Sequence, residues 1–101
     1  MTMPPDKLAR VLKVLSVSTR LRIVELLRGR TLCVNALARK LDVTQGAVSQ
    51  HLRVLKDLGL IHGERRSYRI HYFLNQERLA EYQELAQTLL GESFVVKWVT
   101  E

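Results

Sequence analysis

The hydrophobic residues follow a helical period over the first sixty positions of the chain. Apolar side chains at i, i+3, i+4 and i+7 predict a helix over residues 6–15 and a second helix that is capped by Ser16 or Ser18 and runs through Arg28. A third, short helix is predicted over residues 34–41, and a turn at Asp42-Val43 leads into a fourth helix. Two helices joined by a turn of about three or four residues are typical of a helix-turn-helix unit.

The fourth predicted helix, residues 45–58, separates polar from apolar side chains most clearly. At about 100° per residue, Val48, Leu52 and Leu55 share one side. Thr44 is a good N-cap, and Gly59 is the expected left-handed stop. The opposite side carries amides, a hydroxyl and cations: Gln45, Gly46, Ser49, Gln50, Arg53 and Lys56, with Asp57 at its edge. Such a surface suits the DNA major groove, because Gln reads adenine, Ser reads either base, and Arg or Lys pairs with guanine or phosphate. An ordinary solvated helix face is the alternative.

His51 lies in phase with the apolar side of the same helix. We therefore expect it to be a packed histidine that makes a hydrogen bond rather than a residue that reads a base.

After Gly59 the period changes from 3.6 to 2, which predicts two strands. The strands cover residues 60–65 and 68–74, around a tight turn at Arg66-Ser67. An isolated hairpin is only marginally stable, so its apolar face should pack on the helices. Three cations, Arg65, Arg66 and Arg69, lie near its tip. They either contact the DNA backbone or minor groove, or they keep the hairpin soluble.

A last helix is predicted from its cap at Asn75 through Leu90, with Gly91 closing it, and a very apolar segment, Phe94–Val99, follows. Exposed apolar patches usually mark an interface. We expect residues 1–15 and 76–101 to contribute a two-fold dimer surface; the alternative is a tail that folds back on its own subunit.

Composition and charge narrow the class of protein. A length of 101 residues, with 47% hydrophobic and 26% charged residues, predicts one globular domain over residues 1–101. The single cysteine, the absence of a long apolar run and an N-terminus without an apolar core predict a cytoplasmic protein that does not enter a membrane. Residues 1–73 hold 14 Lys and Arg against 5 Asp and Glu, whereas residues 74–101 hold 2 against 5. This asymmetry predicts a cationic face toward a polyanion and a different role for the last helix.

No pattern indicates an enzyme. The five glycines form no phosphate-binding array, the sequence shows no Ser/His/acid set and no HExxH, and the cysteine has no arranged base.

Three segments resemble the ArsR/SmtB family of bacterial repressors: Ser18–Leu27, Leu32–Asn35 and Val43–Leu60. The resemblance implies a winged helix-turn-helix, mainly α with a small β-hairpin wing, that dimerises through its first and last helices. It also implies a homodimeric repressor that binds an inverted-repeat operator in double-stranded DNA and is released by an inducer. The residues expected to contact DNA are Thr44, Gln45, Ser49, Gln50, Arg53, Lys56, Arg65, Arg66 and Arg69.

The chain departs from this family at its metal sites. Where many members have two cysteines, it has Cys33 and Asn35, and its last helix offers carboxylates without histidine or cysteine. We therefore expect no metal or other cofactor, and the inducer is unknown. Cys33 should have a lowered pKa, because it lies at a helix start with Arg30 nearby, and it is a candidate thiol sensor. It is otherwise a small buried hydrophobic residue. The alternative functions are a winged-helix protein-interaction module and a metal- or thiol-responsive sensor that uses Cys33.

Overall fold

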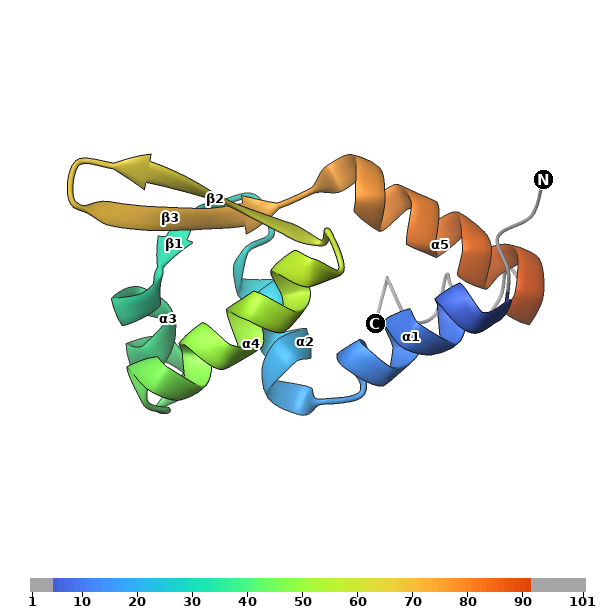
Figure 1. The fold of residues 1–101 in the computed structure, drawn as a ribbon, viewed down its shortest axis with the longest axis horizontal. Coiled ribbons are helices and arrows are strands. Elements are labelled where there is room, and N and C mark those ends of the chain that lie inside the picture. The colour runs from blue at the N-terminus through green and yellow to red at the C-terminus, as the bar shows by residue number, and fades with distance from the viewer. Residues whose placement is uncertain (1–4, 92–101) are drawn as a thin grey trace.

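The computed structural model describes residues 5–91, which contain five helices and three strands (Figure 1). They follow in the order α1 (Pro5–Leu15), α2 (Ser18–Leu26), β1 (Leu32–Cys33), α3 (Val34–Leu41), α4 (Gln45–Asp57), β2 (Ile61–Arg66), β3 (Arg69–Leu74) and α5 (Gln76–Leu90). This order confirms the predicted winged helix-turn-helix. The predictions for residues 1–4 and for the apolar segment Phe94–Val99 lie outside the described residues.

The wing is part of a three-stranded antiparallel sheet with the order β1-β3-β2. Strands β2 and β3 pair from Ile61↔Leu74 to Arg66↔Arg69. The predicted turn is wrong by one residue, since the turn consists of Ser67-Tyr68, with Ser67 at a left-handed φ of 60°. Strand β1 was not predicted, because two residues are too few to show a period of 2.

The core lies where the helices meet beneath the sheet. Each helix and β2 contribute apolar positions of the predicted pattern, and the most deeply buried side chains are Ile23, Leu27, Leu37, Val48, Leu55, Leu60 and Ile61. Burying one such side chain is worth about 1.5–3 kcal/mol. This packing fixes α4 to the core by one side and leaves its other side at the surface.

The helix ends follow the predicted caps, with one exception. The Thr44 side chain accepts a hydrogen bond from the Ala47 N–H at 3.1 Å, and Asn75 accepts one from the Arg78 N–H at 3.2 Å. The predicted serine cap of α2 is wrong, because Val17 occupies the N-cap without a side-chain hydrogen bond, and the helix ends at Leu26 instead of Arg28.

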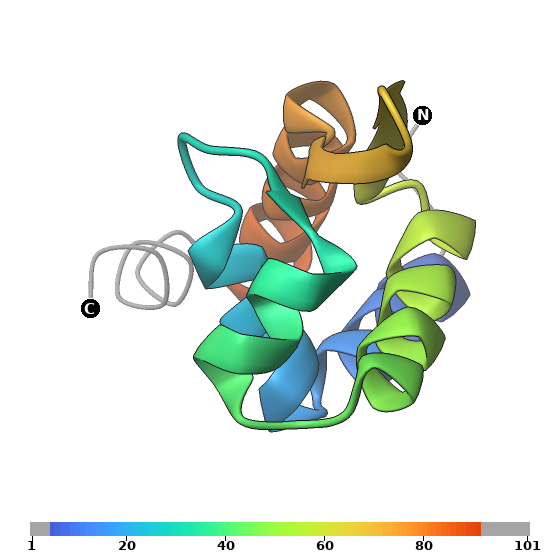
Figure 2. The same ribbon diagram turned by 90° about the vertical axis from the view of Figure 1, so that its left-hand side faces the viewer.

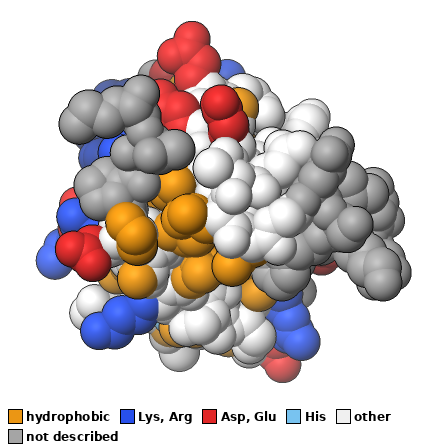
Figure 3. Space-filling view, turned by 90° about the vertical axis from the view of Figure 1, so that its right-hand side faces the viewer, with side chains coloured by type: hydrophobic (Ala, Val, Ile, Leu, Met, Phe, Trp, Pro, Cys, Tyr) orange, Lys and Arg blue, Asp and Glu red, His pale blue; other side chains and the backbone are white. Residues whose placement is uncertain are grey.

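The helices α1 and α5 lie at one end of the molecule, and the wing lies at the other (Figure 1). Seen from the wing end, α3 and α4 lie next to each other below the hairpin (Figure 2). Hydrophobic side chains gather on the opposite end (Figure 3). Leu12 of α1 and Leu89 and Leu90 of α5 remain 38%, 44% and 46% exposed. In the described part of the chain, no helix is long and apolar enough to cross a membrane.

Candidate nucleic-acid interface

The polar side of α4 is free at the surface. Val48, Leu52 and Leu55 are buried and hold the helix against the core. The predicted reading residues are all exposed: Gln45, Ser49, Gln50, Arg53 and Lys56. Within residues 5–91, none of these five side chains makes a hydrogen bond or an ion pair. Their donors and acceptors are therefore available to an external partner. Thr44 is exposed too, and its hydroxyl oxygen caps the helix.

His51 is half-buried on the inner side of α4, as predicted. Its Nδ1 accepts a hydrogen bond from Arg20 Nε at 3.2 Å. Burial lowers the pKa of His51, and the positive charge of Arg20 lowers it further. The imidazole is thus neutral near pH 7, with its proton on Nε2.

The three wing arginines do not form one cluster. Arg66 and Arg69 are directly opposite in the register and so share one face of the hairpin, whereas Arg65 is opposite Ile70 on the other face. The Arg66 guanidinium donates to Thr31 Oγ1 at 3.3 Å and lies 3.6 Å from the Glu64 carboxylate. Like charges that oppose each other across a hairpin are destabilising, so the Arg66–Arg69 pair favours an anionic partner.

Gly63 fixes how the wing packs. A Cβ atom at Gly63 would lie 2.9 Å from Ile70 Cγ2 and 3.1 Å from Tyr72 Cε1. The two side chains therefore pack directly over the glycine and support the hairpin from one face.

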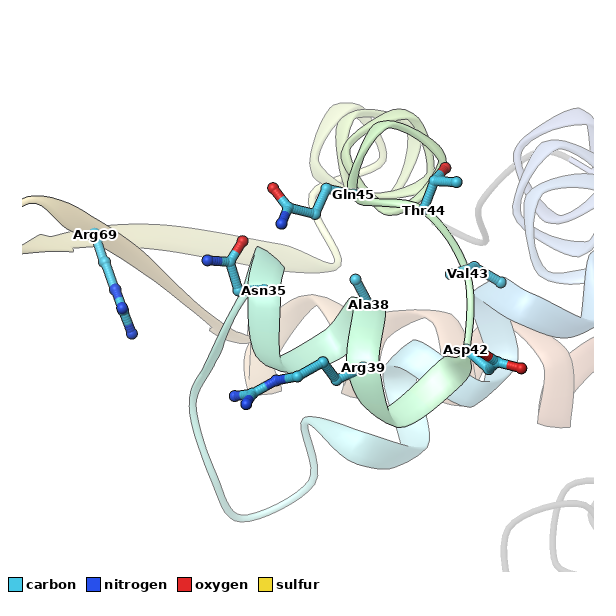
Figure 4. A pocket seen from close by; sticks show the side chains of 8 residues that line it. All are labelled: Asn35, Ala38, Arg39, Asp42, Val43, Thr44, Gln45 and Arg69. Carbon is cyan, nitrogen blue, oxygen red and sulfur yellow. The ribbon is translucent and has the colours of Figure 1, made fainter.

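A groove of about 580 Å³ lies between the wing and one side of α3 together with the start of α4. Its lining comes from three elements and one loop: Asn35, Ala38, Arg39, Asp42, Val43, Thr44, Gln45 and Arg69. In Figure 4, the side chains of Asn35, Arg39 and Gln45 extend toward the side on which Arg69 descends from β3. Two cations and two amides thus face one open space.

Sequence reasoning missed part of this groove. Neither Asn35 nor Arg39 is among the residues that the sequence predicts to contact DNA. No local signal marks Asn35, because its significance depends on the distant residue Arg69 being placed across the groove. The fold alone brings the two together.

Cys33 ends β1 and occupies the N-cap of α3, and its side chain is buried. The backbone N–H of Ala36 lowers the pKa of the thiol most; burial opposes this effect, and the N–H of Asn35 and the charge of Arg69 lower the pKa further. The side chain makes no capping hydrogen bond, so these N–H groups act chiefly through their dipoles. The predicted lowering is confirmed, but the nearby cation is Arg69 and not Arg30.

A second pocket, of about 390 Å³, lies between β1 and the wing. It is lined by Cys33, Val34, Asn35, Tyr68, Arg69, Ile70 and Tyr72. Arg69 therefore lines both this pocket and the groove in front of α4.

The described residues bring together no three side chains among His, Cys, Asp and Glu that would hold a metal ion. On α5, Glu81 is engaged with the Arg78 guanidinium at 3.5 Å. The expected lack of a metal or other cofactor stays a prediction.

Comparison with known proteins identifies the family. Residues 18–62 match the model described as "Bacterial regulatory protein, arsR family". The chain is 39% identical over 90 residues to the HTH-type transcriptional repressor SmtB of Mycobacterium tuberculosis (strain ATCC 25618 / H37Rv), an alignment that covers 89% of this chain and 67% of the repressor. The chain thus spans about two thirds of that relative's length.

Two solved structures share the fold. Reduced HlyU from Vibrio cholerae N16961 is 29% identical with a TM-score of 0.68, over 83% of this chain and 90% of that one. The homodimeric winged helix-turn-helix DNA-binding domain Mb0332 from Mycobacterium bovis, a possible ArsR-family regulator, is 29% identical with a TM-score of 0.68, over 88% and 82%. Together with the exposed polar side of α4, these relationships show that the chain belongs to the ArsR/SmtB family of winged helix-turn-helix proteins and is a DNA-binding transcriptional regulator, not an enzyme.

Proposed function

We propose that two copies of this chain form a homodimer that binds an inverted-repeat operator in double-stranded DNA and represses transcription until an inducer releases it. One observation carries the proposal: α4 presents a row of exposed side chains that have no hydrogen-bond or ion-pair partner within residues 5–91, on a helix whose other side is buried in the core. Two-fold symmetry would place the two reading helices about 34 Å apart, in successive major grooves. Because the proposed target is DNA, we propose that the regulator acts in the cytoplasm.

The end of the molecule with α1 and α5 supports the dimer. Leu8 packs against Leu85 and Ala86 between the two helices, while Leu12 and Leu89 stay exposed beside them. Apolar side chains that remain exposed in a small monomer usually mark an interface. A second copy of this face is the natural cover, and the similar M. bovis domain is homodimeric.

Base contacts and phosphate contacts are divided between two surfaces in this proposal. Four side chains of α4 contact base edges: Gln45, Ser49, Gln50 and Arg53. Thr44 and Lys56 contact the DNA strand at the edge of the major groove. Wing residues Arg65, Arg66 and Arg69 contact the DNA backbone.

The groove between the wing and α3 accommodates a phosphate strand, with Arg39 and Arg69 as cations and the Asn35 amide as a hydrogen-bond donor. The reading side has no aromatic anchor of the kind that protein interfaces favour, which argues against an interaction module.

Selection of bound duplexes from a random pool tests the proposal. The purified chain should enrich a palindrome whose half-site centres are about one helical turn apart, and sedimentation should show two chains per duplex. Failure to retain any duplex at low salt would refute the proposed function. Enrichment of a single half-site bound by one chain would refute the dimer.

A thiol-responsive release is a second candidate, favoured by the position of Arg69. Its side chain lines both the Cys33 pocket and the groove, so an adduct on the sulfur would displace a proposed phosphate contact. The lowered pKa of Cys33 increases the thiolate fraction that reacts with an oxidant or an electrophile. We propose no metal ion or organic cofactor for this function.

A further inference from the structure

We propose that Arg20 and Tyr82 are positioning residues that fix the angle of α4 relative to α1 and α5. The inference rests on the proposed function, because this angle matters only when two copies present their reading helices to one duplex.

Arg20 connects three helices through one guanidinium. Its Nη1 donates to the Val14 carbonyl in the last turn of α1 at 3.2 Å, and its Nε donates to His51 Nδ1 on α4 at 3.2 Å. The carbonyls of a last turn have no partner within their own helix, so Arg20 satisfies one that would otherwise depend on water. A guanidinium is a rigid planar fork, so the two bonds together restrict the distance between α1 and α4.

Tyr82 makes the corresponding connection from α5. Its hydroxyl donates to the Leu58 carbonyl at 2.6 Å, and the side chain is only 6% exposed. Leu58 is the C-cap of α4, so the bond holds the end of the reading helix. Loss of the hydroxyl would leave a buried carbonyl without this partner.

The two connections differ in kind from the apolar packing around them. Packed leucines hold α4 against the core, but hydrophobic attraction has no preferred direction. Hydrogen bonds depend steeply on angle and distance, and these two act at the middle and at the end of α4. Tyr82 belongs to α5, which lies at the apolar end of the molecule. Arg20 belongs to α2 and is bonded to α1, which lies at the same end. A small rotation of α4 in each subunit would change the separation of the two reading helices.

A spacing series tests the inference. The half-site selected by the wild-type chain is placed in duplexes whose centre-to-centre spacing changes by single base pairs around the optimum. The variants are Arg20→Lys, which keeps the charge without the fork, and Tyr82→Phe, which removes only the hydroxyl. Arg22→Lys and Tyr68→Phe are matched controls, since both residues are exposed and neither side chain makes a hydrogen bond within residues 5–91.

The readout is the ratio of Kd values for the optimal and the adjacent spacing. We expect each variant to lower this preference about 3- to 10-fold, the range of one hydrogen bond, while the controls keep it. The isolated half-site, measured below the Tm of every variant, should bind with unchanged affinity, which a general loss of structure would not allow. Wild-type spacing preference in both variants would overturn the inference alone, whereas failure of the wild type to bind any duplex would overturn the proposed function together with it.

Discussion

Removing the two groove cations should reduce the salt dependence of DNA binding by a calculable amount. In the double variant Arg39→Gln/Arg69→Gln, the two cations that line the groove become neutral amides. Neither guanidinium forms an ion pair within residues 5–91, so the exchange breaks no internal salt bridge. The loss should therefore appear in DNA binding and only weakly in stability.

The expected magnitude follows from counterion release. Each neutralised phosphate contributes a slope of about −0.9 to log K against log salt concentration. If each arginine contacts one phosphate, a dimer of the variant loses four contacts, and its slope becomes shallower by about 3.6. Between 50 and 200 mM salt, wild-type affinity should then fall about 150-fold more than that of the variant.

Fluorescence anisotropy of a labelled duplex at four salt concentrations measures the slope, once with the selected sequence and once with a scrambled sequence. The control variant Arg10→Gln/Lys13→Gln loses the same charge from exposed positions of α1, at the end opposite the wing (Figure 1). Its slope should stay near the wild-type value. Equal slopes for the groove variant and the wild type would refute the phosphate site, and equal reductions in both variants would show that only net charge matters.

Three further predictions concern single residues. Arg53→Ala should cost about 1–3 kcal/mol with the selected duplex and much less with a scrambled one, if Arg53 reads a base; an equal loss with both duplexes would indicate a phosphate contact. Cys33 should react with iodoacetamide at a lower pH than a free cysteine, because its pKa is lowered, and the adduct should weaken operator binding. If Cys33→Ser and the wild type respond equally to an oxidant, the thiol is not the sensor. Because folding lowers the pKa of His51, the unfolded chain binds a proton on this side chain at a higher pH than the folded chain does. The contribution of neutral His51 to the free energy of unfolding is therefore complete above the ordinary pKa of 6.5 and decreases as the pH falls below it. The Tm of the wild type should therefore decrease between pH 7 and pH 5 more than that of His51→Gln, and parallel curves would contradict this assignment.

Periodicity predicted most of the fold because this chain separates its polar and apolar positions clearly. Alternation predicted the two strands of the wing but not their register: a turn at Arg66-Ser67 would place Tyr72 opposite Ile61, whereas the structure pairs Ile61 with Leu74. The turn was misplaced because Ser67 adopts the left-handed region, which local sequence rules assign more readily to glycine or asparagine. The start of α2 was misread for a related reason. Ser16 was available as a cap, but its hydroxyl donates to the Lys13 carbonyl at 2.7 Å and closes α1 instead.

The candidate site was also predicted only in part. Helical periodicity predicted the exposed side of α4, whereas the groove could be identified only from the packing of several elements. The period of α4 identified which of its side chains face outward, because that depends on one helix alone. The groove depends on residues from α3, α4 and β3, and no pattern in one segment states the distance between them. Position 35 illustrates the consequence. Judged by family resemblance, Asn35 was a missing thiolate, whereas the structure places its amide across a groove from Arg69. A cysteine there would give a metal ion a ligand but would offer a phosphate only a weak donor, and asparagine has the opposite preference. The departure that removes a metal ligand therefore supplies a hydrogen-bond donor to the surface where DNA is proposed to bind.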